Sequence, residues 1–282
     1  FSCYREFGAA LLRGLPLQKL LDNVFGNQND TAKGRQMPHH CTSRSVGWAS
    51  VSSPVGTQIT HAMGFGWAAK LDRADRVALT YFGDGATSSS DFHSGMNFAG
   101  VHRIPCVFLC RNNGWAISTP ADRQTASRTF AEKAHGYGVP GIRVDGNDVL
   151  AVISVTRRAV ARAAAGLGPT LIEAVTYRMG AHTSSDDPNR YRRGEETEPW
   201  RQLDPNQRLN ELLLARGLWD ETREREMVSE IDRQFREAVA LAESADPPPL
   251  ESMFDDVYEK PPWHLLEQRA ELLAGPRVPT SD

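Results

Sequence analysis

The sequence has few cysteines, no long apolar run and almost no excess of either charge. No two of its four cysteines (Cys3, Cys41, Cys106 and Cys110) have the CxxC spacing of a zinc-binding pair, so they are expected to be reduced thiols of an intracellular protein. The longest apolar candidate, 104–110, is far shorter than the roughly 20 residues that a membrane span needs. With 32 Lys and Arg against 35 Asp and Glu, the net charge of −3 predicts no nucleic-acid partner.

The composition is that of a folded globular protein. Of the 282 residues, 40% are hydrophobic and 24% are charged, which excludes a disordered, collagen-like or coiled-coil chain. This length is enough for one large domain or two small ones.

The middle of the chain alternates predicted strands with predicted helices. Early helices are expected at 3–13, 16–25 and 59–71, with a long polar loop between the last two. Strands then follow at 76–82, 105–111, 141–144 and 170–177, and helices at 89–101 and 149–165. Strands that alternate with helices predict an α/β fold whose parallel sheet is flanked by helices.

After residue 178 the sequence becomes polar and then helical. Helices are predicted at 206–216, 221–244 and 263–273. We therefore expect an α/β domain over 1–200 and a helical extension over 201–282, which would pack on the same domain or on a partner subunit.

A glycine-rich turn, Gly83-Asp84-Gly85-Ala86-Thr87-Ser88, follows the strand predicted at 76–82. Free backbone N–H groups and the positive end of the next helix would face an anion here, and Ser88 with Asp91 fits the capping pattern of that helix. Asp84 repels a phosphate unless a divalent cation bridges the two, and Mg²⁺ suits such oxygen ligands. The turn predicts a diphosphate site, with a purely structural turn as the alternative for this motif alone.

The strand predicted at 105–111 ends in Arg111-Asn112-Asn113-Gly114. The carboxyl ends of parallel strands face one crevice at the edge of the sheet. Asn113 would offer a neutral oxygen to the same cation, so Asp84 and Asn113 are predicted to converge on one metal ion.

Together the two motifs resemble the thiamine diphosphate-binding motif, GDG followed by NN. The chain as a whole is similar to the alpha subunit of the decarboxylating component of 2-oxo acid dehydrogenase complexes, of the branched-chain (2-oxoisovalerate) type. The matching stretches span nearly the whole chain: 4–6, 34–38, 52–58, 111–120, 143–148 and 176–187. The N-terminal part of such subunits has no counterpart here, so the chain is expected to be a fragment that lacks it.

The resemblance implies which residues hold the cofactor. Mg²⁺ would be bound by the side chains of Asp84 and Asn113 and by the backbone carbonyl of Trp115. The residues implied to contact thiamine diphosphate are Tyr4, Arg5, Ser53, Val55, Gly83, Asp84, Gly85, Ala86, Arg111, Asn113, Ile117 and His182. A solvated arginine is the alternative for Arg5, and an ordinary core residue for Val55.

The resemblance also implies a K⁺-binding loop, with Ser52, Pro54, Thr57 and Gln58 as ligands and a loop without an ion as the alternative. His182 is implied to be catalytic, because a histidine near the diphosphate can supply a proton or charge during acyl transfer to lipoamide. Its alternative is a structural histidine. Thr183, Ser184 and Ser185 match a loop that kinases control in eukaryotic relatives, where a phosphate would repel the cofactor's phosphates.

The implied activity is the oxidative decarboxylation of a branched-chain 2-oxo acid, with acyl transfer to the lipoyl group of an acyltransferase partner. The carboxylate that activates the cofactor would come from a beta subunit in an alpha2beta2 heterotetramer, so neither Glu6 nor Glu173 is assigned that role. The chain alone is expected to be inactive, and no membrane partner is expected.

Two other functions stay open. The chain could be the alpha subunit of a pyruvate or acetoin dehydrogenase, or a scaffold subunit without cofactor. Cys3 stands where relatives commonly have a Gln that faces the substrate, which leaves the substrate preference open. Helices rich in Arg and Ala favour a bacterial cytoplasmic protein, with the mitochondrial matrix as the alternative.

Overall fold

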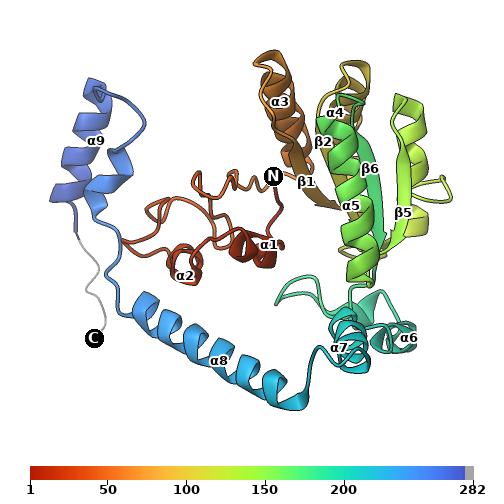
Figure 1. Cartoon of the computed structure of the whole chain (residues 1–282). Coiled ribbons are helices and arrows are strands. Elements are labelled where there is room, and N and C mark those ends of the chain that lie inside the picture. The colour runs from red at the N-terminus through yellow and green to blue at the C-terminus, as the bar shows by residue number, and fades with distance from the viewer. Residues whose placement is uncertain (277–282) are drawn as a thin grey trace. The chain divides into compact units, whose positions relative to one another are not determined.

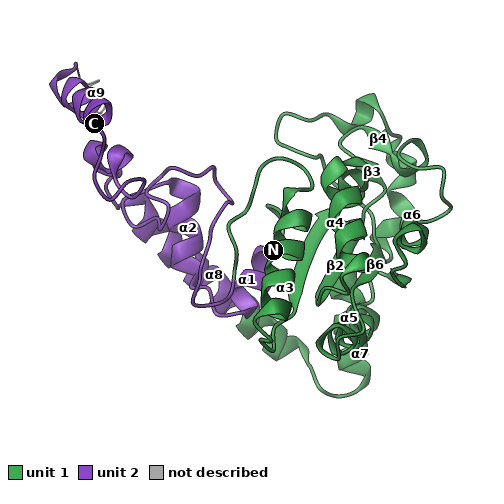
Figure 2. Ribbon diagram, turned by 90° about the horizontal axis from the view of Figure 1, so that it is seen from above, with its two compact units in different colours: residues 1–6, 48–227 green, residues 7–47, 228–282 purple. Residues whose placement is uncertain are grey.

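The computed structural model describes residues 1–276, which form two compact units (Figures 1 and 2). The first unit comprises 1–6 and 48–227, and the second begins with 7–47 and resumes at 228. Helix α8 (Glu221–Glu243) is continuous across the junction at 227 and 228. The domain division expected at residue 200 stays a prediction, and these units divide the chain at other positions.

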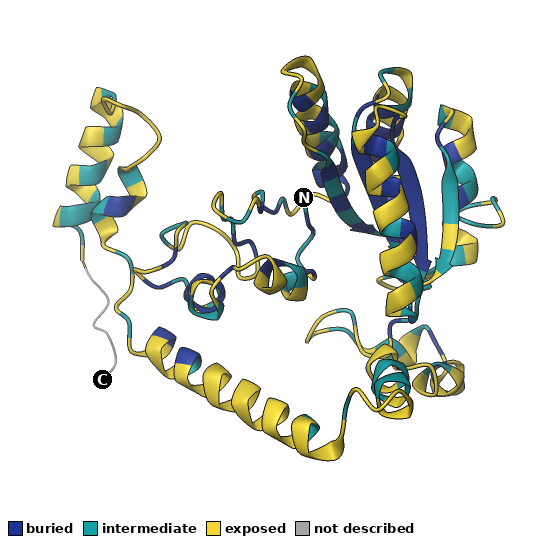
Figure 3. Cartoon of the chain, viewed as in Figure 1, coloured by how far each residue is buried: buried dark blue, intermediate teal, exposed yellow. Residues whose placement is uncertain are grey.

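The first unit is built on a four-stranded sheet in the order β1-β2-β6-β5, in which all strands are parallel. Figure 3 shows its central strands as the most deeply buried part of the unit. Their apolar and β-branched side chains suit a sheet that is covered on both faces. The strands are β1 (Ala78–Gly83), β2 (Cys106–Asn112), β5 (Gly141–Asp145) and β6 (Thr170–Val175).

Successive side chains of β2 point to opposite faces of the sheet and enter two separate clusters. Cys106, Phe108 and Cys110 pack with residues of helices α3 and α4, whereas Val107 and Leu109 pack with residues of helix α5. The predicted fold class, a parallel sheet flanked by helices, is confirmed. The other elements of this unit are α3 (Thr57–Leu71), α4 (Ser90–Val101), α5 (Val149–Ala164), α6 (Glu198–Arg201), α7 (Pro205–Ala215), the hairpin strands β3 (Trp115–Ala116) and β4 (Thr119–Pro120), and the 3₁₀ turns η1 (Asp84–Ser88), η2 (Ala121–Arg123), η3 (Ala131–Tyr137), η4 (Pro188–Arg190) and η5 (Gly194–Glu196).

Strand register brings the carboxyl ends of three strands together. Gly83 at the end of β1 lies beside Arg111 of β2, and Asn112 of β2 lies beside Val175 of β6. The segments that follow these strands therefore meet at one edge of the sheet, as the alternating pattern predicts.

Two predicted helix starts are wrong in detail. The helix after β1 is capped by Ser89, whose side chain accepts from the Phe92 backbone N–H, and not by Ser88, because the 3₁₀ turn η1 comes first. Helix α1 covers Phe7–Leu12 rather than 3–13, and Phe1, at the start of the segment before it, is hydrogen-bonded to Leu79 and Tyr81 at β1. Residues 1–6 thereby become part of the first unit.

The second unit is helical in the part that the structure describes. Helix α2 (Leu17–Phe25) packs on the C-terminal half of α8, where Leu21, Ala238 and Ala242 form a small buried cluster. Asn27, which follows α2, donates to the carbonyl oxygen of Ala242 over 3.1 Å. The other elements of the second unit include η6 (Leu250–Phe254) and α9 (Trp263–Ala274).

Among residues 1–276, none of the helices has both the length and the apolar character that a membrane crossing requires.

The packing of α4 can be tested at Gly100. A Cβ at this position would lie 2.2 Å from the backbone oxygen of Tyr137, so Gly100→Ala must displace main chain. We expect it to reduce the free energy of unfolding by about 1–3 kcal/mol in urea titrations of the full-length protein.

Gly64→Ala in α3 is the matched control, because a Cβ there meets nothing within 4 Å. Removal of a glycine from an open helix position should raise stability by about 0.5–1 kcal/mol. Equal effects of the two substitutions would contradict this packing.

Candidate functional site

A pocket of about 290 Å³ lies in the first unit, beyond the carboxyl ends of β1 and β2. It is lined by every residue that the sequence assigns to the cofactor or to Mg²⁺, and by three of the four residues assigned to K⁺. Thr57 is the exception. The lining residues are Cys3, Tyr4, Arg5, Ser52, Ser53, Pro54, Val55, Gln58, Gly83, Asp84, Gly85, Ala86, Arg111, Asn113, Trp115, Ala116, Ile117 and His182.

Asp84 is the one carboxylate in the lining of this pocket, and it is almost completely buried. Among the described residues, no Lys, Arg or His nitrogen lies within ion-pair distance of it, and its Oδ2 atom accepts from Gln124 Nε2 over 2.6 Å. Burial raises the pKa of Asp84, and hydrogen bonds from Gln124 and from the backbone N–H of Asn113 oppose that rise. A buried carboxylate without a cation is costly, so its environment suits a bound metal ion.

The two asparagines after β2 have different partners. Asn112 donates from Nδ2 to the buried carboxylate of Glu173 over 2.8 Å, away from the pocket lining. Asn113 lines the pocket, and its Oδ1 atom accepts from the Trp115 backbone N–H over 3.1 Å. The structure therefore brings Asp84 and Asn113 together, because both residues line the same pocket.

No group of three or more His, Cys, Asp or Glu side chains within residues 1–276 is arranged to hold a metal. The set expected for Mg²⁺ has a different composition: one carboxylate (Asp84), one amide oxygen (Asn113) and one backbone carbonyl (Trp115). Hard oxygen donors of this kind suit Mg²⁺, whose remaining ligands in such sites are phosphate oxygens and water. The magnesium site stays a prediction.

Glu6 joins the N-terminal segment to the pocket. Its carboxylate forms an ion pair with Arg111 and accepts from the Cys3 backbone N–H over 3.0 Å. The sequence did not assign Glu6 a role, although it follows the predicted pair Tyr4 and Arg5. Arg111 therefore lines the pocket with its positive charge already paired to Glu6. The positive charge of Arg5 is less compensated than that of Arg111.

Arg5 contacts His182, and both residues line the pocket. Its Nη2 atom lies 3.2 Å from His182 Nδ1 and donates to the His182 carbonyl over 3.0 Å. Because a guanidinium can only donate, Nδ1 must accept, which leaves the ring proton of a neutral His182 on Nε2. Partial burial and the charges of Arg5 and Arg178 lower the pKa of His182, which agrees with a neutral ring.

A chain of hydrogen bonds that the sequence did not predict holds the His182 segment. Asp186 accepts from the His182 backbone N–H over 2.7 Å and from the Tyr191 hydroxyl over 2.6 Å. Arg178 donates to Tyr191 over 2.6 Å and to the carbonyl of Ile117 over 2.7 Å. Arg178 and Asp186 lie in the stretch 176–187 that resembles the family, although no role was predicted for either. These contacts connect the His182 segment to the β3–β4 hairpin.

Ile117 has a backbone conformation that β-branched residues rarely adopt. It is the first of two residues between β3 and β4, and its φ is 54°. Glycine is favoured at such hairpin positions, and a left-handed conformation costs an L-residue about 1–2 kcal/mol. Its side chain is 55% exposed, so burial does not repay this strain within the chain.

Of the residues expected to bind K⁺, Thr57 donates its hydroxyl to the Pro54 carbonyl over 3.0 Å. Gln58 donates from its side chain to the Tyr81 carbonyl over 3.1 Å. The hydroxyl oxygen of Thr57 and the carbonyl oxygen of Pro54, two of the expected K⁺ ligands, are therefore close together. The potassium site stays a prediction.

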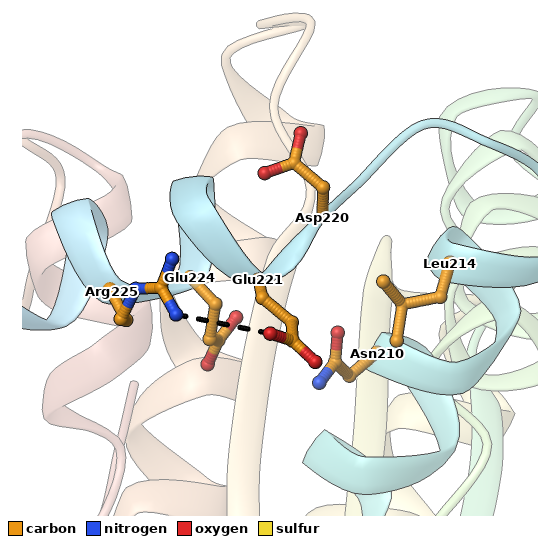
Figure 4. Close-up of a pocket in the computed structure, with 6 residues that line it drawn as sticks. All are labelled: Asn210, Leu214, Asp220, Glu221, Glu224 and Arg225. Atoms are coloured by element: carbon orange, nitrogen blue, oxygen red, sulfur yellow. Dashed lines mark ion pairs between the residues drawn. The ribbon is translucent and has the colours of Figure 1, made fainter.

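A second pocket, of about 240 Å³, lies between α7 and the start of α8 (Figure 4). Its three carboxylates already have partners: Asp220 pairs with Arg223, Glu221 pairs with Arg225, and Glu224 accepts from Trp219. Its remaining lining residues are Asn210 and Leu214, and no predicted site residue lies in it.

The strain at Ile117 can be tested with glycine. Ile117→Gly should relieve the left-handed conformation and, after the entropy of the added glycine, raise the free energy of unfolding by about 0.5–1 kcal/mol. It should also weaken ligand binding in the pocket, because the apolar side chain that lines it is lost. Urea titration and ligand calorimetry measure the two effects.

Ser118→Gly is the control, because Ser118 is the other residue of the same turn and its φ is not positive. It should lower stability by about 0.5–1 kcal/mol. A loss of stability in both variants would contradict stored strain at Ile117.

Comparisons with known proteins identify the family of the chain. The model of the family "dehydrogenase E1 component" matches residues 1–251. The chain is 44% identical to the 2-oxoisovalerate dehydrogenase subunit alpha 2, mitochondrial, of Arabidopsis thaliana over 95% of the chain and 57% of that protein. It is 43% identical to the subunit alpha, mitochondrial, of Homo sapiens over 96% of the chain and 61% of that protein. The chain thus spans about three fifths of the length of these curated relatives, and it belongs to the dehydrogenase E1 component family.

Proposed function

We propose that this chain is the alpha subunit of a branched-chain 2-oxo acid dehydrogenase and holds the diphosphate part of a thiamine diphosphate site. The observation that carries the proposal is that Asp84 and Asn113 line one pocket and that the buried carboxylate of Asp84 forms no ion pair with a Lys, Arg or His among the described residues. When bound, thiamine diphosphate supplies the electron sink for decarboxylation of a 2-oxo acid.

The chain's own residues bind and orient that cofactor. Asp84, Asn113 and the Trp115 carbonyl would hold Mg²⁺, and the backbone of Gly83, Gly85 and Ala86 would face the diphosphate. Tyr4, Arg5 and Arg111 would contact the phosphates, and Ser53, Val55 and Ile117 would contact the rings. Ser52, Pro54, Thr57 and Gln58 would hold K⁺.

The site is half of an active site, and two features support this. Within the described residues, Asp84 is the one carboxylate that lines the pocket, so this chain offers no second carboxylate to activate the cofactor. Glu6 is paired with Arg111, and Glu173 accepts from Asn112 and the Ala131 backbone elsewhere. A pocket of about 290 Å³ is also at the small end for a ligand of this size. A beta subunit in an alpha2beta2 heterotetramer would complete the site.

His182 would act in the transfer of the acyl group to the lipoyl group of an acyltransferase partner. Its position beside Arg5 and its neutral ring, with the proton on Nε2, allow it to donate a hydrogen bond or a proton. Asp186 and Arg178 would keep its backbone in place.

The relatives' names support 2-oxoisovalerate as the substrate and a mitochondrial location for those proteins. For this chain, a bacterial cytoplasmic location stays the expectation, and the mitochondrial matrix is the alternative that the relatives favour. Pyruvate or acetoin remains the alternative substrate, which a turnover panel with the beta subunit present would decide.

Asp84→Ala tests the metal assignment. Loss of the carboxylate should abolish Mg²⁺-dependent binding of thiamine diphosphate in calorimetric titrations of the assembled subunits, without unfolding the protein. Asp122→Ala, at an exposed site in η2, is the control and should bind normally. Unchanged affinity of the Asp84 variant would refute the assignment.

His182→Ala tests the transfer role. It should lower acyl transfer to the lipoyl partner by about 100-fold or more, and spare decarboxylation that is measured with an artificial oxidant. His135→Ala, at an exposed position in η3, should change neither rate. Equal losses in both assays would count against this role.

A further inference from the structure

No role is predicted for Gln124 from the sequence, yet its side chain reaches the pocket carboxylate. Its Nε2 group donates to Asp84 Oδ2 over 2.6 Å and to the Thr119 carbonyl over 3.1 Å. An NH₂ group has two hydrogens, so these two bonds use its whole donor capacity. The side chain therefore bridges two segments of the site.

The two segments are the turn after β1 and the β3–β4 hairpin. Thr119 begins β4, and the hairpin carries Trp115 and Ile117, which line the pocket. A Cβ at Gly85 would lie 2.7 Å from the Cβ of Ala116, so the hairpin packs directly on the turn. Gln124 adds the one polar side-chain link between Asp84 and this hairpin among the hydrogen bonds of the described residues.

The neutral amide has a specific chemical consequence. A Lys or Arg at this place would pair with Asp84 and remove the charge that attracts a cation. An amide satisfies one carboxylate oxygen and leaves the negative charge in place. The NH₂ group of the amide faces Asp84 and Thr119, because the atoms it meets there are both acceptors. The Oε1 atom of Gln124 is buried and has no hydrogen-bond partner within residues 1–276.

We propose that Gln124 is a positioning residue that holds the Asp84 carboxylate and the β3–β4 hairpin in place for a divalent cation without neutralising the carboxylate. The inference rests on the proposed function, because the cation is the one expected at the thiamine diphosphate site. Loss of a residue that orients a metal ligand typically weakens metal binding by about 10–100-fold.

The test is the Mg²⁺ affinity of Gln124→Met, which keeps the length of the side chain and removes its donors. In the full-length protein with its partner subunit, Mg²⁺ is titrated calorimetrically at a fixed concentration of thiamine diphosphate. The apparent Kd for Mg²⁺ should rise about 10–100-fold, and saturating Mg²⁺ should restore cofactor binding. A purely structural role would lower Tm without this rescue.

Gln207→Met is the matched control, because Gln207 also donates to a carboxylate, Glu211, over 2.8 Å on the exposed surface of α7. It should leave the Mg²⁺ affinity unchanged. Gln124→Asn is a second variant, which keeps a neutral amide but is one methylene too short to bond to both Asp84 and Thr119, and it should also weaken Mg²⁺ binding; it decides the case if the Met variant does not fold.

The outcomes separate the two proposals. If the wild-type protein shows no Mg²⁺-dependent cofactor binding, both proposals fail. If the wild type binds and either folded Gln124 variant binds Mg²⁺ with wild-type affinity, the positioning role is overturned and the proposed function stands.

Discussion

The buried negative charge of Asp84 is the constraint around which the site is organised. The carboxylate sits at the carboxyl end of β1 with one amide and backbone N–H groups as its partners. These neutral donors stabilise the charge only in part, because desolvation of a carboxylate costs several kcal/mol unless a cation is near. A buried carboxylate of this kind suits a bound cation, and this is the physical basis of the proposed magnesium site.

Polar contacts connect the segments that surround Asp84. Glu6 fixes the N-terminal segment to Arg111, and Arg178 connects the His182 segment to the hairpin through Ile117. The strained backbone of Ile117 fits this picture, since strain of this kind persists where neighbouring contacts enforce it. The sheet is the rigid frame of the site, and these contacts fix the positions of the segments at its edge.

Much of the sheet could be predicted because apolar strands and periodic helices are local signals. The ends of the elements were harder to predict: Ser89 rather than Ser88 caps α4, and α1 begins at Phe7 rather than at residue 3. In the site, the two motifs sufficed to bring Asp84 and Asn113 together. The roles of Gln124 and Tyr191 could not be predicted, because they arise from side-chain contacts that leave no pattern in the sequence. Asp186 lies in the matching stretch 176–187, but that resemblance assigned it no role.

The central claim is that one divalent cation joins the Asp84 turn to the Asn113 turn. Anomalous diffraction from crystals of the assembled protein, grown with thiamine diphosphate and with Mn²⁺ in place of Mg²⁺, tests it directly. The account predicts a single strong peak within bonding distance of the Asp84 carboxylate, the Asn113 side-chain oxygen and the Trp115 carbonyl. A peak elsewhere in the chain, or a bound cofactor with no metal beside Asp84, would contradict it.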